Sequence, residues 1–562
     1  IFKILLLIVS NLLFSQEALK SIEEEYYDFL SLQGIVERPT LGYKTLSDSV
    51  WSIPSDYDTE HIWKNNNLGT TKILYKSNNQ GKNWFTKGFF HGLKFKIYGP
   101  EWFNSYNTTA PYGQNDGALW QGKGYNTSFS TGFRLEGYGF EITFKPQFCF
   151  SQNLKFEIMP STYDSEFGYF WGYAKNVGVD KPQRFGDKSF ATFDWGNSEI
   201  RYTWKNFTIG FGTQSIWLGP AQINPMLHSN NAATYPKIDL GIRKTKLYIP
   251  FNNIYLGDIE FRSWVGFLSE SKYFDNNNTN NHNQIAGFTF SYSPPFLKDF
   301  TLTLNKICIS KWGKDSLKYL NPFYNKNNYS QGDLGEDQKL SIAINWLIPK
   351  GGVELYGELA IDDKVNKNTN IFSILTHFWH TSAFVAGVKK KIDFPKKSNY
   401  SLEIIFEWYN SEMSQDMQVQ WFYSFGFHNL ITQGYTNKGQ YLGSGAGYGG
   451  QGQYLGFKLY YPKGFTNFFI YRNQPDNDYL FKESIYDSAD PVLGDKSDLH
   501  KRTWNCYKTN VSIGLDSTLF HNNMLFNFGV VYTLMVNPLY KSEPRYDTWH
   551  NISILLTLKY LI

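Results

Sequence analysis

The stretch Leu340-Ser341-Ile342-Ala343-Ile344-Asn345-Trp346 places an apolar side chain at every second position. A period of two is that of a β-strand with one apolar face, because successive side chains point to opposite sides of a strand. The same alternation recurs beyond residue 88, for example in Leu93-Lys94-Phe95-Lys96-Ile97 and from Ile552 to Ile562. The pattern predicts an all-β protein built from many half-buried strands.

The connections between these stretches are of two lengths, and this asymmetry separates a membrane barrel from a soluble sandwich, which also alternates. Short turns recur, as at Lys205-Asn206 and Pro462 to Gly464. Between them lie long polar segments, such as 269–284, 310–337 and 474–507. Short turns at one end and long loops at the other are typical of an outer-membrane β-barrel.

The alternation and the turns together predict eighteen antiparallel strands. We expect them near 89–98, 132–148, 153–159, 195–205, 207–216, 239–249, 254–268, 285–293, 300–309, 338–348, 352–361, 381–392, 399–409, 452–461, 465–473, 508–516, 524–534 and 549–562. An even number returns both ends of the barrel to the periplasm. For the last strand to run into the periplasm, residues 410–451 must form an extracellular excursion that folds over or into the barrel mouth.

Composition excludes several other classes of protein. Aromatic residues make up 19% of the 562 residues, and a mean hydropathy of −0.42 is too polar for a bundle of membrane-spanning helices. The 54 Lys and Arg nearly balance the 50 Asp and Glu, which argues against nucleic acid as a partner. Cysteines at 149, 308 and 506 form neither a complete disulfide set nor a zinc motif.

The first 88 residues differ from the rest. Residues 1–15 carry Lys3, an apolar run and a terminal Ser15, as a secretion signal does. Apolar residues at helical spacing between Glu17 and Leu32 predict a helix, and Ser47 and Asp48 are residue types that begin helices. We therefore expect a signal peptide over 1–15, a small periplasmic helical region over 16–88 and a barrel over 89–562.

Charged residues of both signs fall on the face that alternates with the apolar one. Mixed signs leave two interpretations: paired charges that fill the lumen, or the lining of an open pore, although a strongly selective channel tends to use one sign. The lumen charges expected are Arg201, Arg262, Glu354, Glu358, Glu403 and Glu407.

Two predicted loops carry the mixture that sugar recognition needs, namely aromatic rings for the C–H face of a pyranose and amides for its hydroxyls. The candidate carbohydrate-binding residues are Trp217, Asn224, Asn230, Asn231 and Tyr235 in loop 217–238, and Tyr435, Lys438, Gln440 and Tyr441 in loop 410–451. The alternative is that these aromatics pack or form an interfacial girdle, and that the glycines of 443–452 only shape a loop.

Signals for catalysis are weak. His228 and Ser229 are adjacent but lack an evident third partner, and Glu354 and Glu358 lie roughly 13 Å apart by strand rise, too wide for a glycosidase pair. His377 and His380 with Asp362 are too few for a metal site. We assign no catalytic residue, metal or cofactor.

Three stretches resemble the capsule assembly Wzi family of Gram-negative outer-membrane proteins. They are Tyr27-Asp28-Phe29-Leu30-Ser31-Leu32-Gln33-Gly34; Trp217-Leu218-Gly219-Pro220 continuing through Leu227-His228-Ser229-Asn230-Asn231-Ala232 to Tyr235-Pro236-Lys237-Ile238; and Gly434-Tyr435-Thr436-Asn437-Lys438-Gly439-Gln440-Tyr441-Leu442-Gly443. The resemblance implies an eighteen-stranded barrel with a small periplasmic helical bundle and a lectin role at the cell surface, not an enzyme. His228, Ala233 and Tyr235 depart from the family pattern.

We therefore expect a protein of the outer membrane that binds capsular or other surface polysaccharide and helps capsule assembly or retention. Its other expected contacts are outer-membrane lipid and other envelope proteins. Two alternatives remain: a diffusion porin for nutrients, which needs an unobstructed lumen, and a barrel subunit of a larger secretion complex.

Overall fold

The computed structural model describes residues 14–16, 19–54, 61–66, 72–78, 81, 83–159, 170–173, 177–250, 252–275, 281–324, 335–362, 382–394, 399–412, 425–428, 431–478, 507–540 and 547–561. Residues 1–13 of the expected signal peptide lie outside this set. Within it, no helix has the length and apolar character needed to cross a membrane.

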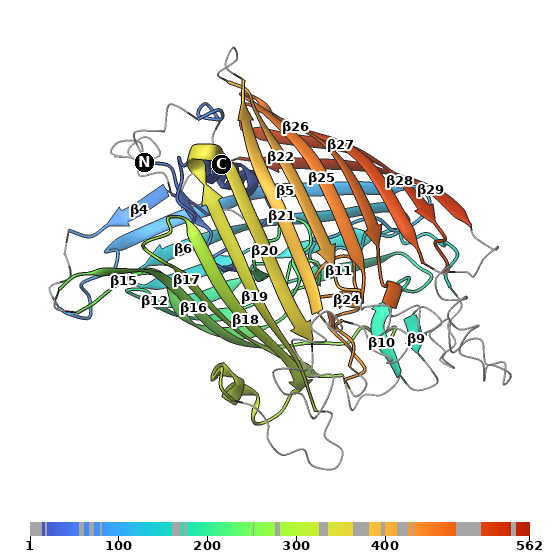
Figure 1. Cartoon of the computed structure of the whole chain (residues 1–562), viewed down its shortest axis with the longest axis horizontal. Helices are drawn as coiled ribbons and strands as arrows, with labels where there is room; N and C mark the ends of the chain where they lie inside the picture. Colours follow the sequence, from blue (N-terminus) through green and yellow to red (C-terminus); the bar gives the residue numbers. More distant parts are fainter. Residues whose placement is uncertain are drawn as a thin grey trace, which may run out of the picture.

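Eighteen antiparallel strands, tilted and wrapped around one axis, close into a barrel (Figure 1). β29 pairs with β5 to close the ring. Two of the eighteen consist of two segments each, β7 with β8 and β11 with β12. The strands are β5 (Gly92–Asn107), β6 (Gly124–Gly137), β7 (Phe140–Phe144) with β8 (Gln147–Ser151), β11 (Phe190–Asp194) with β12 (Glu199–Trp204), β13 (Phe207–Gly212), β15 (Lys237–Tyr248), β16 (Tyr255–Phe267), β17 (Asn283–Ser293), β18 (Phe300–Lys311), β19 (Glu336–Ile348), β20 (Val353–Asp362), β21 (Ser382–Asp393), β22 (Ser401–Asn410), β25 (Gln451–Tyr461), β26 (Gly464–Gln474), β27 (Thr509–His521), β28 (Met524–Val536) and β29 (Thr548–Tyr560).

The remaining elements are short. Before the barrel come β1 (Phe14–Gln16), α1 (Ile22–Leu32), β2 (Tyr43–Lys44), β3 (Val50–Ser52) and β4 (Lys72–Lys76), which pairs with the start of β5. The connections contain β9 (Phe170–Tyr173), β10 (Val177–Pro182), β14 (Trp217–Leu218), β23 (Thr436–Asn437), β24 (Gln440–Tyr441), and the 3-10 helices η4 (Ser316–Leu320) and η5 (Pro349–Gly351). In Figure 1, β9, β10 and η4 lie at the end of the barrel opposite to η5.

The predicted number of strands is confirmed, and the first predicted strand, 89–98, falls on β5, but the second and third are misplaced. The predicted strand 132–148 contains a two-residue turn, because Tyr138 and Gly139 both have positive φ, as tight hairpin turns require. β6 therefore ends at Gly137 and β7 begins at Phe140. The strand predicted at 153–159 is absent, because β8 ends at Ser151 and residues 152–159 have no strand pairing. The excursion predicted over 410–451 is confirmed, since β22 ends at Asn410 and β25 begins at Gln451.

The two faces of the wall follow the alternation in the sequence. Ile342 is 46% exposed on the outer face, whereas its neighbour Ser341 is 6% exposed and faces the lumen. The outward positions Ile142, Ile344 and Ile554 are likewise exposed, as predicted. An apolar outer face and a polar lumen are what a barrel surrounded by lipid requires.

The N-terminal region closes the short-turn end of the barrel. α1 begins after Ser21, whose hydroxyl accepts a hydrogen bond from the Glu24 N–H at 3.2 Å. Its Phe29 ring stacks on Tyr460 of β25 with ring centroids 4.2 Å apart. The short turns are periplasmic by strand parity, so the expected N-terminal helix lies at the periplasmic mouth.

Residues 38–49 continue from α1 into the lumen and are held by ion pairs with the wall. The Arg38 guanidinium donates to both carboxylate oxygens of Glu354, at 2.6 and 2.7 Å. The Asp48 carboxylate accepts from Arg243 at 2.7 Å and from Arg262 at 2.6 Å. The helix predicted to begin at Ser47 and Asp48 is absent, because both side chains bond wall residues in place of capping a helix.

Ile404 tests the assignment of the two faces. It alternates with the buried Glu403 and Glu407 and faces outward. Ile404→Arg should lower the free energy of unfolding by about 2–4 kcal/mol, whereas Leu402→Arg, on the same face but nearer the periplasmic end, should cost only about 0–1 kcal/mol. Urea titration in phospholipid vesicles, followed by gel mobility, measures both. Wild-type stability for Ile404→Arg would show that the faces are inverted.

Candidate functional site

Two extracellular connections enter the lumen and bind each other: residues 213–236, and the described residues of 411–450, which are 411–412, 425–428 and 431–450. The Ser229 hydroxyl donates to the Gly443 carbonyl at 2.8 Å, and the Asn231 side-chain amide donates to the Tyr441 carbonyl at 2.9 Å. The Asn437 amide donates to the Ala233 carbonyl at 2.8 Å. The two connections therefore form one packed unit, called here the loop plug.

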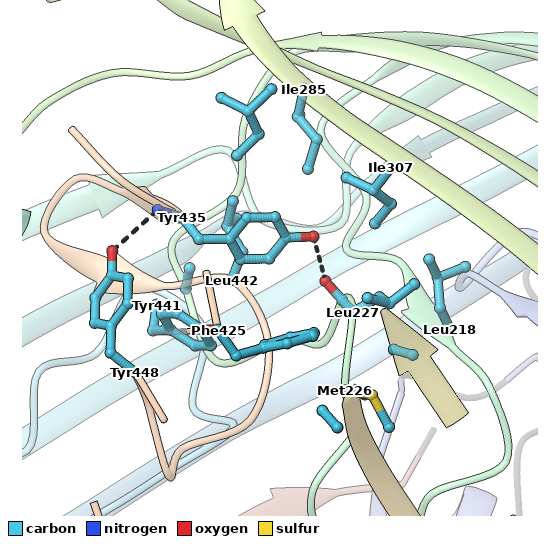
Figure 2. Packing of buried hydrophobic residues seen from close by; sticks show 14 of the residues in the cluster. Leu218, Met226, Leu227, Ile285, Ile307, Phe425, Tyr435, Tyr441, Leu442 and Tyr448 are labelled. Atoms are coloured by element: carbon cyan, nitrogen blue, oxygen red, sulfur yellow. Dashed lines mark hydrogen bonds between the residues drawn. The ribbon is translucent and has the colours of Figure 1, made fainter. Parts of the chain in front are cut away.

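The loop plug has an apolar core of its own. Figure 2 shows Leu218, Met226 and Leu227 of the first connection facing the aromatic rings of the second, with Ile285 and Ile307 of the barrel wall beside them. The Tyr435 hydroxyl donates to the Leu227 carbonyl at 2.7 Å, and the Tyr435 N–H donates to the Tyr448 hydroxyl at 2.9 Å (Figure 2). These buried hydrogen bonds hold the rings of Tyr435 and Tyr448 in place within the core of the loop plug.

Lumen carboxylates hold the backbone of the first connection. Glu407 accepts from the N–H groups of Gln222 and Asn224 at 2.6 and 2.7 Å. Glu358 lies against Gly219, which has a φ of +77°. A Cβ at Gly219 would collide with the Glu358 carboxylate, so glycine is needed there for both space and conformation.

The loop plug also meets the N-terminal segment inside the barrel. β14 pairs with β2, with Leu218 opposite Tyr43 and Trp217 opposite Lys44. Glu260 supports the segment from the wall by accepting from the Gly42 N–H at 2.8 Å. Extracellular and periplasmic parts of the chain thus share backbone hydrogen bonds within the lumen.

The predicted lumen charges all lie where expected. Each is at most 3% exposed. Arg201, Arg262, Glu354 and Glu403 form ion pairs with other wall residues or with the N-terminal segment. Glu358 and Glu407 accept hydrogen bonds from the wall and from the loop plug. Paired charges therefore fill this part of the lumen.

The predicted sugar-binding residues divide into two groups. The structure buries Trp217, Asn224, Tyr235, Tyr435 and Tyr441 in the loop plug, and it leaves Asn230, Asn231, Lys438 and Gln440 half-buried. Trp217 donates to the Ala221 carbonyl at 3.0 Å, and the Tyr235 hydroxyl lies 2.6 Å from His228 Nε2. The residues of the first group are at most 5% exposed, so sugar contact by the nine residues stays a prediction.

An extracellular cavity of about 480 Å³ lies between the loop plug and the wall formed by β26 to β29 and β5. Its aromatic lining includes Tyr112, Trp120, Phe156 and Trp549, and its amide lining is Gln114, Gln121, Gln183, Asn231, Gln440, Asn473 and Asn510. Among the predicted site residues, Asn231, Gln440 and Tyr441 contribute to it. The cavity is within the usual size range of small-ligand sites, about 300–1,000 Å³.

The cavity has unused hydrogen-bonding capacity. Five residues of its lining each carry a buried polar atom that lacks a hydrogen-bond partner among the described residues: Trp120 Nε1, Gln121 Oε1, Tyr441 OH, Asn473 Oδ1 and Asn510 Oδ1. A buried polar group without a partner costs about 1–3 kcal/mol, so a ligand rich in hydroxyl groups gains by satisfying them. Sequence inspection missed Trp120, although the Gly- and amide-rich run around it (112–121) is a usable signal.

Asp116 is the titratable group at the base of the cavity. Burial raises the pKa of Asp116 to about 7, although the Gln121 amide donates to its carboxylate at 2.6 Å. At the cavity mouth, Lys181 and Asp476 form an ion pair at 2.5 Å. Asp116 therefore changes its charge close to physiological pH.

The residues considered for catalysis, His228 and Ser229, make structural hydrogen bonds. His228 Nδ1 lies 2.8 Å from the Ile216 carbonyl and its Nε2 bonds Tyr235, while Ser229 bonds the second connection. No group of three His, Cys, Asp or Glu able to hold a metal ion occurs among the residues that the structure describes. His377 and His380 lie outside them.

A closed eighteen-stranded barrel with an apolar outer face, a lumen filled from both ends and an extracellular cavity defines an outer-membrane β-barrel. Residues 104–278 match the family model described as capsule assembly protein Wzi, so the resemblance to this family is confirmed. The chain is a protein of the outer membrane.

One solved structure shares this fold. The chain is 13% identical to Escherichia coli Wzi, with a TM-score of 0.50 over 83% of this chain and 85% of that one; Wzi is described as an outer-membrane protein involved in group 1 capsule assembly and as a carbohydrate-binding β-barrel. Acinetobacter baumannii OccAB1 is 9% identical over 82% of this chain and 96% of its own, and Pseudomonas putida OprB is 10% identical over 84% and 98%, both with a TM-score of 0.36. No curated protein matches the chain in sequence.

Asp116 gives a test of the cavity's electrostatics. Its folded-state pKa of about 7 lies above the ordinary value of about 3.9, so ionisation opposes folding and stability falls as pH rises between these values. Asp116→Asn should therefore stabilise the protein relative to wild type, and more at pH 8 than at pH 5. Thermal unfolding in detergent at the two pH values measures this.

The matched control for Asp116→Asn is Asp315→Asn, at an exposed ion pair with Lys318. This control should shift the midpoint little at either pH. An equal shift for Asp116→Asn at pH 5 and pH 8 would contradict the assignment of a raised pKa.

Proposed function

We propose that this protein binds capsular or other surface polysaccharide at the extracellular cavity and helps to assemble or retain the capsule. The observation that carries the proposal is the cavity lining, in which aromatic rings stand beside buried amide oxygens that have no partner among the described residues. Rings cover the C–H faces of sugars and amides bond their hydroxyls. The family match and the description of the Escherichia coli relative support the same function.

The filled lumen favours this function over a nutrient porin. Residues 38–49 and the loop plug occupy the barrel interior and are fixed by ion pairs and hydrogen bonds to the wall. A diffusion porin needs an unobstructed lumen. The engaged state of His228 and Ser229 also supports a binding protein over a hydrolase.

The sharpest test removes cavity groups without touching the packed core of the loop plug. Trp120→Ala with Asn510→Ala removes one ring and one amide oxygen without a partner, at a combined cost to binding of about 1–3 kcal/mol. We expect roughly 10- to 100-fold weaker binding of purified protein to polysaccharide extracted from the surface of its host cells. Cells that carry the variant should shed capsule into the medium.

Trp312→Ala is the matched control, because Trp312 is a partly exposed aromatic beyond the end of β18 that does not line the cavity. Gel mobility confirms that both variants fold and insert. If the cavity variant binds polysaccharide as wild type does and retains capsule, the cavity is not the site. Tyr435→Ala is a poor test, since its buried hydroxyl holds the loop plug together.

A further inference from the structure

A short segment outside the barrel packs on its lipid-facing surface at the periplasmic rim. Trp84 meets Trp204 of β12 edge to face with ring centroids 4.7 Å apart, and Trp204 Nε1 donates to the Phe85 carbonyl at 3.2 Å. Trp204 and Tyr202 alternate with the buried, lumen-facing Arg201 and so face outward. The segment therefore occupies space that lipid takes elsewhere around the barrel.

The same segment leaves large apolar side chains uncovered. Trp84 is 69% exposed and Phe85 is 52% exposed. Three consecutive residues of β4, namely Ile73, Leu74 and Tyr75, are each about half exposed. Directly paired residues share a face of the sheet, and Lys72 and Tyr75 pair with the outward Phe95 and Leu93, whereas Ile73 pairs with Lys94 on the lumen face. We call Trp84, Phe85 and Tyr75, together with the exposed Lys72 and Lys87, the rim patch. Exposed apolar patches of this kind mark interaction sites.

The position of the rim patch points to lipid as its partner. Trp84 lies beside the periplasmic turn between β12 and β13, where Lys205 is 5.0 Å above its ring. Outward residues next to this turn, Phe140 and Phe207, are 54% and 57% exposed and belong to the lipid-facing band. The rim patch is therefore continuous with an apolar surface that already meets the bilayer.

The charges of the rim patch suit the headgroup layer. Lys72 and Lys87 are exposed beside the apolar side chains, and Lys205 lies over both Trp84 and Trp204. Tryptophan and tyrosine prefer the boundary between hydrocarbon and headgroups, and lysine places its stem along apolar surface and its ammonium among phosphates.

We propose that the rim patch is an interfacial anchor that binds phospholipid of the periplasmic leaflet of the outer membrane. It fixes the depth of the barrel at its periplasmic end, on the side of β12 and β13. This anchor is independent of polysaccharide binding, which takes place at the opposite end of the barrel.

The test places an NBD fluorophore at Trp84→Cys in full-length protein whose cysteines at 149, 308 and 506 are replaced by serine. The protein is reconstituted in phosphatidylcholine vesicles with or without bromine atoms near the glycerol end of the acyl chains. Lys350→Cys, in the exposed periplasmic turn η5, is the matched control. Gel mobility verifies folding, and Phe85→Cys replaces Trp84→Cys if that variant fails to fold.

An anchor predicts that brominated lipid lowers the emission at position 84 by about twofold or more, while aqueous iodide quenches it weakly. The label at position 350 should show the reverse. Strong iodide quenching at 84 without lipid quenching would overturn the proposal. Shielding from both quenchers would also overturn it, because a protein surface would then cover the rim patch.

Discussion

The Asp48 carboxylate lies between the guanidinium groups of Arg243 and Arg262, and much of this molecule depends on that contact. A lumen lined with arginines and carboxylates is stable only if each charge finds a partner, because an unpaired buried charge is costly. The N-terminal segment supplies some partners and the wall supplies others. Once this segment is seated, it supports the loop plug, and the loop plug in turn forms one side of the extracellular cavity.

Much of the fold follows from the sequence, because apolar and polar residues must alternate along a strand that has lipid on one side and a polar lumen on the other. The alternation locates most strands to within a few residues. It fails at Tyr138 and Gly139, where a two-residue turn built on positive φ moves the apolar positions from odd to even numbers. A bulge within one continuous strand produces the same shift, so the pattern alone does not reveal the turn. It also misjudges Ser47 and Asp48, which have the local chemistry of a helix start. Ion pairs with distant arginines outweigh that local preference.

The site was only partly predictable. The loops around Trp217 and Tyr435 were identified, but which of their aromatic rings stay accessible is a property of packing. Tyr435 and Tyr441 are residue types found in sugar-binding sites, but here they pack in the apolar core of the loop plug. Trp120, Asn473 and Asn510 come from three separate parts of the chain and meet only in the closed barrel. No local sequence pattern predicts that these three residues lie together.

The contacts of the N-terminal segment with distant parts of the chain have a consequence for the order of assembly. Arg38 is separated from Glu354 by 316 residues, and Trp63 bonds a carbonyl 398 residues away. Contacts between such distant positions form late, because closing long loops is slow and entropically costly. The N-terminal segment is made first, yet its last partners exist only when the C-terminal strands are in place. The lumen is therefore filled only after the C-terminal strands have joined the barrel. A truncated chain lacks the contacts that hold the N-terminal segment in the lumen.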